Sequence, residues 1–318
     1  MIGPTWLVDD LLRVESLMVE RAGESVQPLV AEAATHLINA GGKRLRPALV
    51  LLSSRAGEPG RAESDMAAAA VELVHLATLY HDDVIDETEV RRGVPTVHSK
   101  WGVEVAVLAG DYLFAVGCIL GATAGGEVPK ILATALADVC EGQIAETQAL
   151  NDPDRSVDDY LGTIGRKTGA LFRASCELGA STSGAGPAER AALTGYGQNL
   201  GAAFQLVDDV IDLIGDPDVT GKTPGTDLRE GVFTLPVLLA STRDRELRDA
   251  LAAGERDLDW VLPYLRSTSS IEDTLAEARS FGEQATEAIR GLPESEWSDA
   301  LRTIVGGILA QVPSSVTD

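Results

Sequence analysis

Apolar residues recur every three to four positions along nearly the whole chain, which is the spacing of the buried stripe of an amphipathic helix. Alternating runs of β-branched and aromatic residues, the signature of strands, are nearly absent. The sequence is therefore expected to be all-α. The pattern predicts helices over residues 5–22, 26–40, 46–57, 62–89, 103–122, 127–149, 156–182, 188–215, 232–253 and 270–311, the last broken near Pro293.

Helix start signals support several of these ranges. Ser156 and Ser270 are each followed by an aspartate three residues later, which is the spacing of a capping box, and Pro187 stands where a first helical turn would begin. Breakers at 121–126, 181–187 and 215–225 separate the helices but are too short for domain linkers. We expect a single domain over residues 1–318.

An acidic pattern occurs twice inside apolar helical sequence, as Asp82-Asp83-Val84-Ile85-Asp86 and as Asp208-Asp209-Val210-Ile211-Asp212. Residues four apart lie about 40° apart around a helix and about 6 Å along it, so the outer carboxylates of each copy share a face. Such carboxylates repel one another and need a cationic partner, for which Mg²⁺ is suited. A solvated acidic edge is the alternative for one copy. Two copies with the same spacer favour metal sites on two facing helices.

Composition limits the partners. The chain has 318 residues and a formal net charge of -23, with 26 Lys and Arg against 49 Asp and Glu. Such a charge disfavours nucleic acid and anionic membrane surfaces, which would repel it. No apolar run is expected to reach the length of a membrane span, and the N-terminus lacks a signal-peptide pattern, so a cytoplasmic protein is expected. Cys118, Cys140 and Cys176 show no paired spacing and are interpreted as small core residues in a reducing compartment.

Basic residues gather at a few points. A glycine turn carries three cations just before a helix that Pro47 is expected to open: Gly41-Gly42-Lys43-Arg44-Leu45-Arg46-Pro47. Backbone amides, a helix N-terminus and fixed cations favour phosphate. Arg91-Arg92 follow the first acidic pattern, and Lys167-Thr168 and Lys222 lie at other helix ends or loops. Each alone is more often a surface charge, but together with the acidic sets they indicate a site for a diphosphate bridged to carboxylates by metal.

The sequence resembles the trans-isoprenyl diphosphate synthases, or polyprenyl synthetases. The resemblance rests on six blocks in family order between about residues 40 and 236: 41–47, 81–87, 91–93, 167–168, 204–212 and 221–228. It implies a large helical bundle of the isoprenoid synthase type, with a central cavity between two Asp-rich helices.

The resemblance also implies roles for the residues of these blocks. Asp82, Asp86 and Asp208 would hold Mg²⁺, with three ions per site, on the diphosphate of an allylic substrate. Asp83, Asp209 and Asp212 would be secondary ligands. Contacts to that diphosphate would come from Arg91, Lys167 and Lys222, and Thr168 and Gln205 would line the reacting region. Isopentenyl diphosphate would bind to Lys43, Arg46, His75 and Arg92.

The implied reaction is a 1′–4 trans condensation. The allylic C–O bond ionises as metal and cations stabilise the departing diphosphate. The double bond of isopentenyl diphosphate attacks the cation, and proton loss, with released diphosphate as the base, leaves an allylic product five carbons longer.

The helix of the first acidic pattern also contains residues expected to determine product length, here called the length ruler: Val74, Ala77 and Thr78. Thr78 lies about 6 Å and Val74 about 12 Å below Asp82 along a helix. Bulky aromatics four or five residues before the first aspartate stop growth early in the family, and here those positions hold Thr78 and Ala77. We therefore expect a product of roughly C30 to C50, of the kind used as a quinone side chain. Tyr80 could narrow the tunnel if it faces inward, and Phe114 could set a floor from a neighbouring helix.

The sequence departs from the family pattern at two places, and other functions remain as alternatives. Val232 stands where many relatives have a lysine, and the C-terminus, 311–318, is not basic. A short-chain synthase making farnesyl or geranylgeranyl diphosphate is the main alternative. A class I terpene cyclase is disfavoured by the second Asp-rich pattern, and a non-catalytic partner subunit by the six retained aspartates. The resemblance implies a homodimer without a transmembrane segment, with transient membrane contact for product release.

Overall fold

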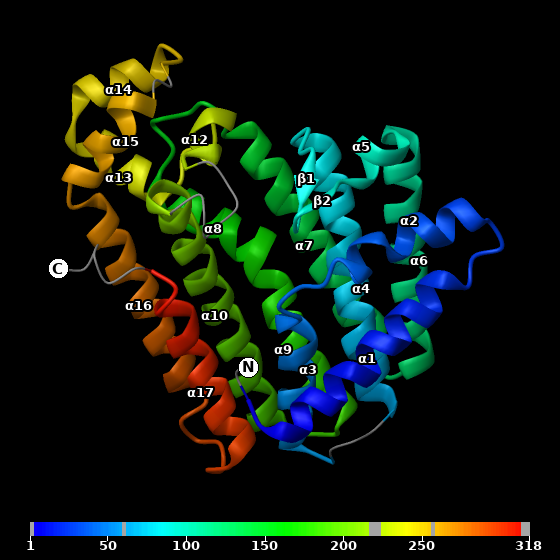
Figure 1. Cartoon of the computed structure of the whole chain (residues 1–318). Coiled ribbons are helices and arrows are strands. Elements are labelled where there is room, and N and C mark those ends of the chain that lie inside the picture. The colour runs from blue at the N-terminus through cyan, green and yellow to red at the C-terminus, as the bar shows by residue number, and fades with distance from the viewer. Residues whose placement is uncertain (1–2, 59–61, 216–223, 256–257, 313–318) are drawn as a thin grey trace. The chain divides into compact units, whose positions relative to one another are not determined.

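The computed structural model describes residues 3–58, 62–215, 224–255 and 258–312, and nearly all of their regular structure is helical (Figure 1). This confirms the all-α expectation. The residues form two units, each assembled from three stretches of chain. Unit 1 contains residues 1–136, 171–197 and 289–301, and unit 2 contains residues 137–170, 198–288 and 302–318. The single domain over residues 1–318 stays a prediction.

Unit 1 contains the N-terminal helices and one short hairpin. Its elements are α1 (Thr5–Gly23), α2 (Pro28–Asn39), α3 (Leu45–Ser53), η1 (Ser54–Ala56), α4 (Ala62–Ile85), β1 (Val90–Arg91), β2 (Val94–Pro95), α5 (Val97–Trp101) and α6 (Val103–Ala124). Most of α9 (Ala170–Thr182) and parts of α7 (Val128–Gln148), α10 (Pro187–Ile214) and α17 (Glu296–Leu309) also belong to it.

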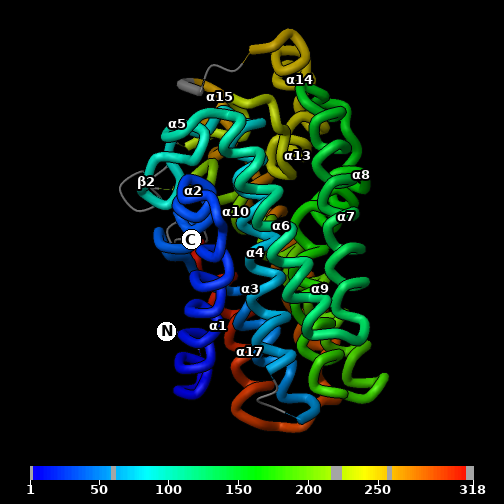
Figure 2. The backbone as a smooth tube through the Cα atoms, turned by 90° about the vertical axis from the view of Figure 1, so that its right-hand side faces the viewer, coloured from blue at the N-terminus to red at the C-terminus, as the bar shows by residue number. Residues whose placement is uncertain are grey.

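The core of unit 1 is built around α4, whose side chains are buried on almost every side. The four alanines at 67–70 are fully buried. Helix α6 runs alongside α4 (Figures 1 and 2). A Cβ on Gly117 of α6 would lie 3.1 Å from Val74 Cγ2 of α4 and 3.2 Å from the Ala70 carbonyl oxygen. The missing side chain therefore permits this close approach.

Unit 2 holds the remaining elements. They are α8 (Val157–Ile164), a π-helical turn η2 (Gly165–Gly169), α12 (Thr226–Glu230), α13 (Leu235–Arg243), α14 (Arg245–Ala252), α15 (Leu258–Ser267) and α16 (Ser270–Ala288), with the C-terminal parts of α7, α10 and α17. Val210 of α10 packs on Ile271 and Leu275 of α16 in a buried apolar cluster. The second acidic motif thus lies on a helix anchored by its opposite side.

Several expected helices differ in extent. The range 62–89 ends as a helix at Ile85, and the range 232–253 is two helices, because Asp244 has extended backbone and its carboxylate accepts from the backbone N–H groups of Glu246 and Leu247. Helix α3 begins at Leu45, so Pro47 lies inside its first turn rather than opening it. The break near Pro293 is confirmed between α16 and α17.

Two of the three predicted helix start signals have the expected geometry, and the third does not. Pro187 is the first residue of α10, and the Ser156 hydroxyl accepts from the Asp159 N–H at 3.1 Å, as expected. Helix α16 begins at Ser270, where Asp273 N–H donates to the carbonyl of Ser269 instead. The elements α5, α12 and the β1–β2 hairpin were not predicted, because five- and two-residue elements leave no periodic pattern. The ten-residue helix α15 was also missed, and it contains Pro263, a residue that usually interrupts a helix.

Two composition-based expectations are wrong. Cys118 and Cys140 are exposed, and only Cys176 is buried. Helix α6 has 22 residues with a mean hydropathy of 1.9, which is long and apolar enough to cross a membrane by length and composition. The run was missed because Glu104 and Asp111 interrupt it. Only 44% of its most apolar 18-residue window is buried, so α6 also presents an exposed apolar face.

Candidate active site

The first acidic motif occupies the C-terminal end of α4 in unit 1. Asp86 is exposed and Asp82 partly exposed, and the Asp86 N–H donates to the Asp82 carbonyl at 2.8 Å, so helical geometry continues through Asp86. The two carboxylates therefore lie one turn apart on one side of the chain, as the spacing predicted.

The middle aspartate of this motif points elsewhere. Asp83 is 1% exposed, and Arg91 of strand β1 donates to it from Nε at 2.5 Å. Burial raises the pKa of Asp83, although the Arg91 guanidinium opposes the shift. Asp83 is thus placed to hold Arg91 and the hairpin, and the direct contact of Arg91 with diphosphate stays a prediction.

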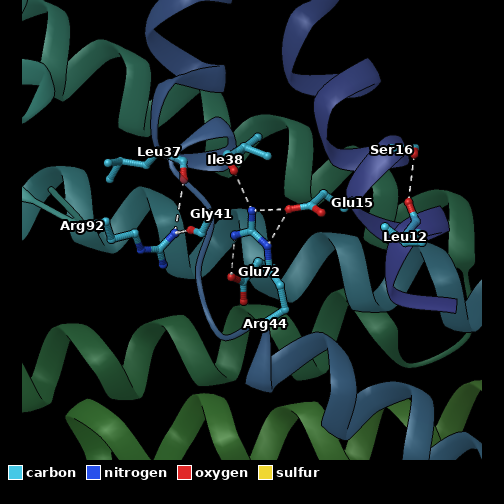
Figure 3. Close-up of polar contacts among 9 residues, drawn as sticks. All are labelled: Leu12, Glu15, Ser16, Leu37, Ile38, Gly41, Arg44, Glu72 and Arg92. Carbon is cyan, nitrogen blue, oxygen red and sulfur yellow. Dashed lines mark hydrogen bonds and ion pairs between the residues drawn. The ribbon is translucent and has the colours of Figure 1, made fainter. Parts of the chain in front are cut away.

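The glycine turn before α3 contains cations with different environments. Lys43 is exposed, whereas Arg44 is 8% exposed and adopts left-handed backbone with φ 47°. The Arg44 guanidinium donates to Glu15 Oε1 at 2.6 Å, to the Ile38 carbonyl at 2.6 Å and to Glu72 Oε1 at 3.3 Å (Figure 3). Arg44 therefore joins α1, α2 and α4, whereas Lys43 lies at an exposed position of the turn.

Arg92 also has bonds within the protein. Its Nη1 donates to the carbonyl of Leu37 at 3.2 Å and to that of Gly41, at the C-terminal end of α2 (Figure 3). A Cβ on Gly42 would lie 2.9 Å from the Arg92 guanidinium carbon, so glycine makes room for this contact. Burial lowers the pKa of Arg92. The guanidinium thus binds helix-end carbonyls, and its role toward isopentenyl diphosphate stays a prediction.

Arg46 and His75 lie in a strongly positive part of unit 1. Burial lowers the pKa of Arg46 to about 10, its guanidinium lies 5.1 Å from the Phe172 ring centroid, and its buried Nε has no hydrogen-bond partner. Burial, followed by the charges of Arg46 and Arg92, lowers the pKa of His75 well below its usual value. His75 is therefore neutral and can donate or accept without adding charge. An unpaired donor among concentrated cations suits an anion such as diphosphate.

The residues of the length ruler lie on the buried length of α4. Ala77 is fully buried, Val74 is 2% exposed, and the Thr78 hydroxyl donates to the His75 carbonyl at 2.7 Å. Tyr80 faces α2, because its hydroxyl donates to the Ala33 carbonyl at 2.7 Å. That hydrogen bond settles the direction of Tyr80, which the sequence left open.

Phe114 lies at the level of the acidic motif. Its ring centroid is 5.5 Å from that of His81, the residue just before Asp82, where Gly110 of α6 also leaves room for the imidazole. Phe114 is therefore beside the start of any chain that grows down α4, and not at its far end.

The second acidic motif lies on α10 in unit 2, and its three carboxylates differ. Asp208 is exposed. Asp212 accepts from the backbone N–H groups of Thr226 at 3.2 Å and Asp227 at 3.3 Å, so its carboxylate caps the start of α12. Asp208 is the member of this motif with the clearest access to a ligand.

Asp209 is the buried member, at 1% exposed. It accepts from the Tyr160 hydroxyl and, at 2.9 Å, from Gln205 Nε2. Burial raises the pKa of Asp209 to about 7, against the opposing effect of these two donors. Burial, followed by the charge of Asp209, raises the pKa of Tyr160 well above its usual value.

Lys167 and Thr168 lie in the π-helical turn η2, a local irregularity that is common at functional sites. The Lys167 ammonium pairs with Glu146 of α7, and the Thr168 hydroxyl donates to Gln205 Oε1 at 2.7 Å. One turn before Glu146, a Cβ on Gly142 would lie 2.5 Å from the Lys167 backbone nitrogen. The structure therefore brings Thr168 and Gln205 together, and their place beside a reacting allylic carbon stays a prediction.

Sequence reasoning missed three residues in this part of unit 2: Gly142 and Glu146, which contact the turn, and Tyr160, which binds Asp209. Gly142 and Glu146 are four residues apart in a predicted helix, so the sequence already placed them on one face of α7. Nothing in the local sequence distinguishes Tyr160. Lys222 lies outside the described residues. Val232 is described, and its N–H donates to the Asp227 carbonyl at 2.8 Å.

The donor chemistry fits a hard divalent cation. Among the described residues no three His, Cys, Asp or Glu side chains gather closely enough to hold a metal by themselves. Mg²⁺ is commonly held by one or two carboxylates together with substrate phosphates, without an all-protein cage. Exposed carboxylates of Asp86 and Asp208 are suited to that mode.

The helical fold, the aspartate sets and the arginine-rich glycine turn define an all-α enzyme class that acts on diphosphate esters. The model of the family called Polyprenyl synthetase matches residues 27–261. The chain belongs to the polyprenyl synthetase family, and with it to the prenyltransferases.

Three curated relatives illustrate the range of the family. Nonaprenyl diphosphate synthase of Mycobacterium tuberculosis is 38% identical over 92% of this chain and 90% of its own length. Heptaprenyl diphosphate synthase component 2 of Geobacillus stearothermophilus is 38% identical, with 94% and 95% covered. Short chain isoprenyl diphosphate synthase of Methanothermobacter thermautotrophicus is also 38% identical, with 95% and 98% covered.

Solved structures agree in fold. A decaprenyl diphosphate synthase from Rhodobacter capsulatus has a TM-score of 0.91 at 36% identity, covering 96% of this chain and 97% of that one. A polyprenyl synthase from Caulobacter crescentus, complexed with calcium and isoprenyl diphosphate, has a TM-score of 0.91 at 34% identity, covering 98% of both chains.

Proposed function

We propose that this chain condenses isopentenyl diphosphate with an allylic diphosphate, in 1′–4 trans fashion, to give a polyprenyl diphosphate. One observation carries the proposal beyond family membership. In both acidic motifs the middle aspartate is buried against protein donors, while Asp86 and Asp208 keep exposed carboxylates. Retained, separately supported motifs are expected of an active synthase and not of a subunit that has lost catalysis.

The proposed cofactor is Mg²⁺. Asp82, Asp86 and Asp208 would hold it, with three ions per site, and Asp83, Asp209 and Asp212 would support these residues through the contacts described above. Bound Mg²⁺ would supply charge stabilisation for the departing diphosphate. The calcium and isoprenyl diphosphate bound by the Caulobacter crescentus relative support this assignment.

The protein's own cations would share that task. Lys167, held by Glu146, and Arg91, held by Asp83, would contact allylic diphosphate together with Lys222. Lys43, Arg46, His75 and Arg92 would bind isopentenyl diphosphate. Neutral His75 can donate one hydrogen bond to a phosphate oxygen without repelling Arg46.

We further propose a product of roughly C30 to C50. Two observations support a tunnel that is not blocked close to Asp82. Ala77 on α4 is small and buried, and the Tyr80 side chain is directed toward α2. Nonaprenyl and decaprenyl synthases among the relatives agree with this length, and the short-chain relative keeps farnesyl and geranylgeranyl diphosphate as alternatives.

The proposed assembly is a cytoplasmic homodimer. Helix α6 exposes large apolar side chains, including Leu108 at 63% and Ile119 at 64%, on one face three turns apart. A second copy of this chain would cover that face. The name of the Geobacillus stearothermophilus relative, component 2, makes a different partner subunit the alternative.

The test is incubation of the purified chain with Mg²⁺, labelled isopentenyl diphosphate and farnesyl diphosphate, followed by separation of products by length. Elongated products are expected, and their absence contradicts the proposal. A cyclised hydrocarbon from farnesyl diphosphate alone indicates a terpene cyclase, and activity only after adding a second subunit indicates a partner component.

Two matched variants sharpen this assay. Asp208→Asn should lower turnover by at least about a hundredfold, because it removes a proposed metal ligand. Asp249→Asn, at an exposed aspartate of α14, is the control and should leave turnover unchanged. Equal activities for the two variants would remove Asp208 from the site.

A further inference from the structure

A chain of hydrogen bonds in unit 2 links a buried tyrosine to the π turn. The Tyr160 hydroxyl of α8 donates to Asp209 Oδ2, and both residues are almost fully buried, at 2% and 1% exposed. Gln205 Nε2 donates to Asp209 Oδ1 at 2.9 Å, and Thr168 Oγ1 donates to Gln205 Oε1 at 2.7 Å. Tyr160 and Asp209 are thus buried, and they are linked to Gln205 and Thr168, the two residues proposed to line the reacting region.

The order of donors and acceptors in this chain follows from the ionised form of Asp209. In that form Oδ1 is an acceptor whichever atom of the Tyr160–Asp209 pair carries the hydrogen that they share. The Gln205 amide must then turn its NH₂ group toward Asp209 and its oxygen toward Thr168. Because that oxygen can only accept, the Thr168 hydroxyl must donate its single hydrogen to Gln205.

We propose that Tyr160 and Asp209 are positioning residues that fix this order, so that Thr168 presents oxygen lone pairs to the electron-poor allylic carbon. The inference rests on the proposed function, in which that carbon becomes cationic as diphosphate departs. A hydroxyl that pointed its hydrogen at the carbon would oppose the developing charge, whereas lone pairs stabilise it.

The competing role for Asp209 is direct metal binding. Both of its oxygens already accept hydrogen bonds and it is 1% exposed, whereas neighbouring Asp208 is exposed. Adjacent residues on a helix point about 100° apart, so the two carboxylates face different surroundings. The geometry assigns ligand binding to Asp208 and orientation of Gln205 to Asp209.

The first experiment removes only the tyrosine hydroxyl. Tyr160→Phe should lower kcat by about tenfold or more, because loss of orientation at a reacting centre is costly. The KM values for both diphosphates and the Mg²⁺ concentration for half-maximal rate should change by less than about twofold, since Tyr160 touches none of these ligands.

Tyr196→Phe is the matched control. Tyr196 is fully buried and its hydroxyl donates to the Leu301 carbonyl at 2.7 Å in unit 1, so it is a buried tyrosine bond without a link to the π turn. Its kcat should stay within about twofold of wild type. Equal kcat losses in the two folded variants, checked by circular dichroism, would overturn the proposal.

The second experiment reverses the order of the bonds and then restores it. In Asp209→Asn the new amide accepts from Tyr160 and donates to Gln205, so the Gln205 amide must turn its NH₂ group toward Thr168. Thr168 then accepts and directs its hydrogen elsewhere, and kcat should fall by about tenfold or more. In the double variant Asp209→Asn with Gln205→Glu, the new carboxylate accepts from both neighbours and Thr168 donates again.

The double variant should therefore recover at least about fivefold in kcat over Asp209→Asn alone. No recovery, or a raised Mg²⁺ requirement in Asp209→Asn that Gln205→Glu leaves in place, would overturn the proposal and make Asp209 a metal ligand. Wild type assayed in parallel separates this outcome from failure of the proposed function, which would show as no elongated product from wild type.

Discussion

Adjacent residues of the same motif do different work in this protein. In each acidic motif the second aspartate is 1% exposed and held by a donor from another element, Arg91 for Asp83 and Tyr160 for Asp209. A pair of neighbouring aspartates therefore combines a solvent-accessible residue with a buried anchor for the helix. The same division appears among the cations of the glycine turn before α3.

Arg44 and Lys43 provide a test of that division. Arg44→Met should lower the free energy of unfolding by about 3–5 kcal/mol, because it leaves the buried carboxylate of Glu72 without its cation. Lys43→Met removes the same charge from an exposed position and should change stability by less than about 0.5 kcal/mol while raising KM for isopentenyl diphosphate. Urea unfolding and steady-state kinetics measure the two effects. Similar stability losses would show that Lys43 is also structural.

Asp209 should make stability depend on pH. Its pKa is raised to about 7 in the folded protein, against about 3.9 for an unfolded aspartate. The folded state therefore binds more protons between these values, and stability falls as pH rises through them, by at most about 1.4 kcal/mol per pH unit. Urea unfolding of wild type and Asp209→Asn, in the presence of chelator, should show wild type losing stability relative to the variant up to about pH 7. A constant difference would contradict the raised pKa.

At the scale of elements, the long helices followed from periodicity and the irregular ones did not. Helices α4, α6 and α10 lie where the apolar pattern predicted them, because each has many turns to repeat it. The π turn at Gly165–Gly169 and the break at Asp244 depend on contacts with other parts of the chain, or on one side chain that caps the backbone. A single-residue cause leaves no period in the sequence.

The π turn should be sensitive to the helix beside it. Gly142→Ala would place a Cβ 2.5 Å from the backbone nitrogen of Lys167, and backbone cannot move aside cheaply. We expect kcat/KM to fall by about a hundredfold, because a shift of about 1 Å displaces Lys167 and Thr168 together. Gly162→Ala, in α8 where nothing lies within 4 Å, is the control and should leave kcat/KM unchanged. If both variants kept full activity, the π turn would be able to shift without displacing Lys167 and Thr168 from their working positions.

The ruler on α4 predicts a change in product length. Ala77→Phe should shorten the products, because the new ring would close the proposed tunnel below Asp82. It should also cost about 1–3 kcal/mol of stability, since Ala77 is fully buried. Tyr80→Phe is the control, because Tyr80 faces α2, and its products should keep their length. An unchanged distribution for Ala77→Phe would place the floor on another helix.

For the whole molecule, the sequence predicted where the motifs lie better than it predicted which of their side chains are buried. The helical position of both aspartate motifs was predictable because residue type and spacing determine it. The burial of Asp83, Asp209 and Arg44 was not, because it depends on which distant elements pack over them. Nor did composition reveal that α6 would expose its apolar residues, since the same residues would suit a core helix.

That exposed face of α6 gives the last prediction. The chain carries a net charge of -23, so two copies repel at long range and their association must be stabilised by apolar area. Leu108→Glu with Ile119→Glu should convert the proposed dimer to a monomer, whose mass is 33.4 kDa in the wild type, by placing unpaired carboxylates in the interface. Leu12→Glu, at an apolar residue of α1 that is 57% exposed, adds the same kind of charge elsewhere and should leave the dimer intact.

Light scattering coupled to size-exclusion chromatography without detergent measures the mass. A monomeric wild type that co-floats with neutral lipid vesicles would instead make this face a membrane contact, because α6 is also apolar enough for one.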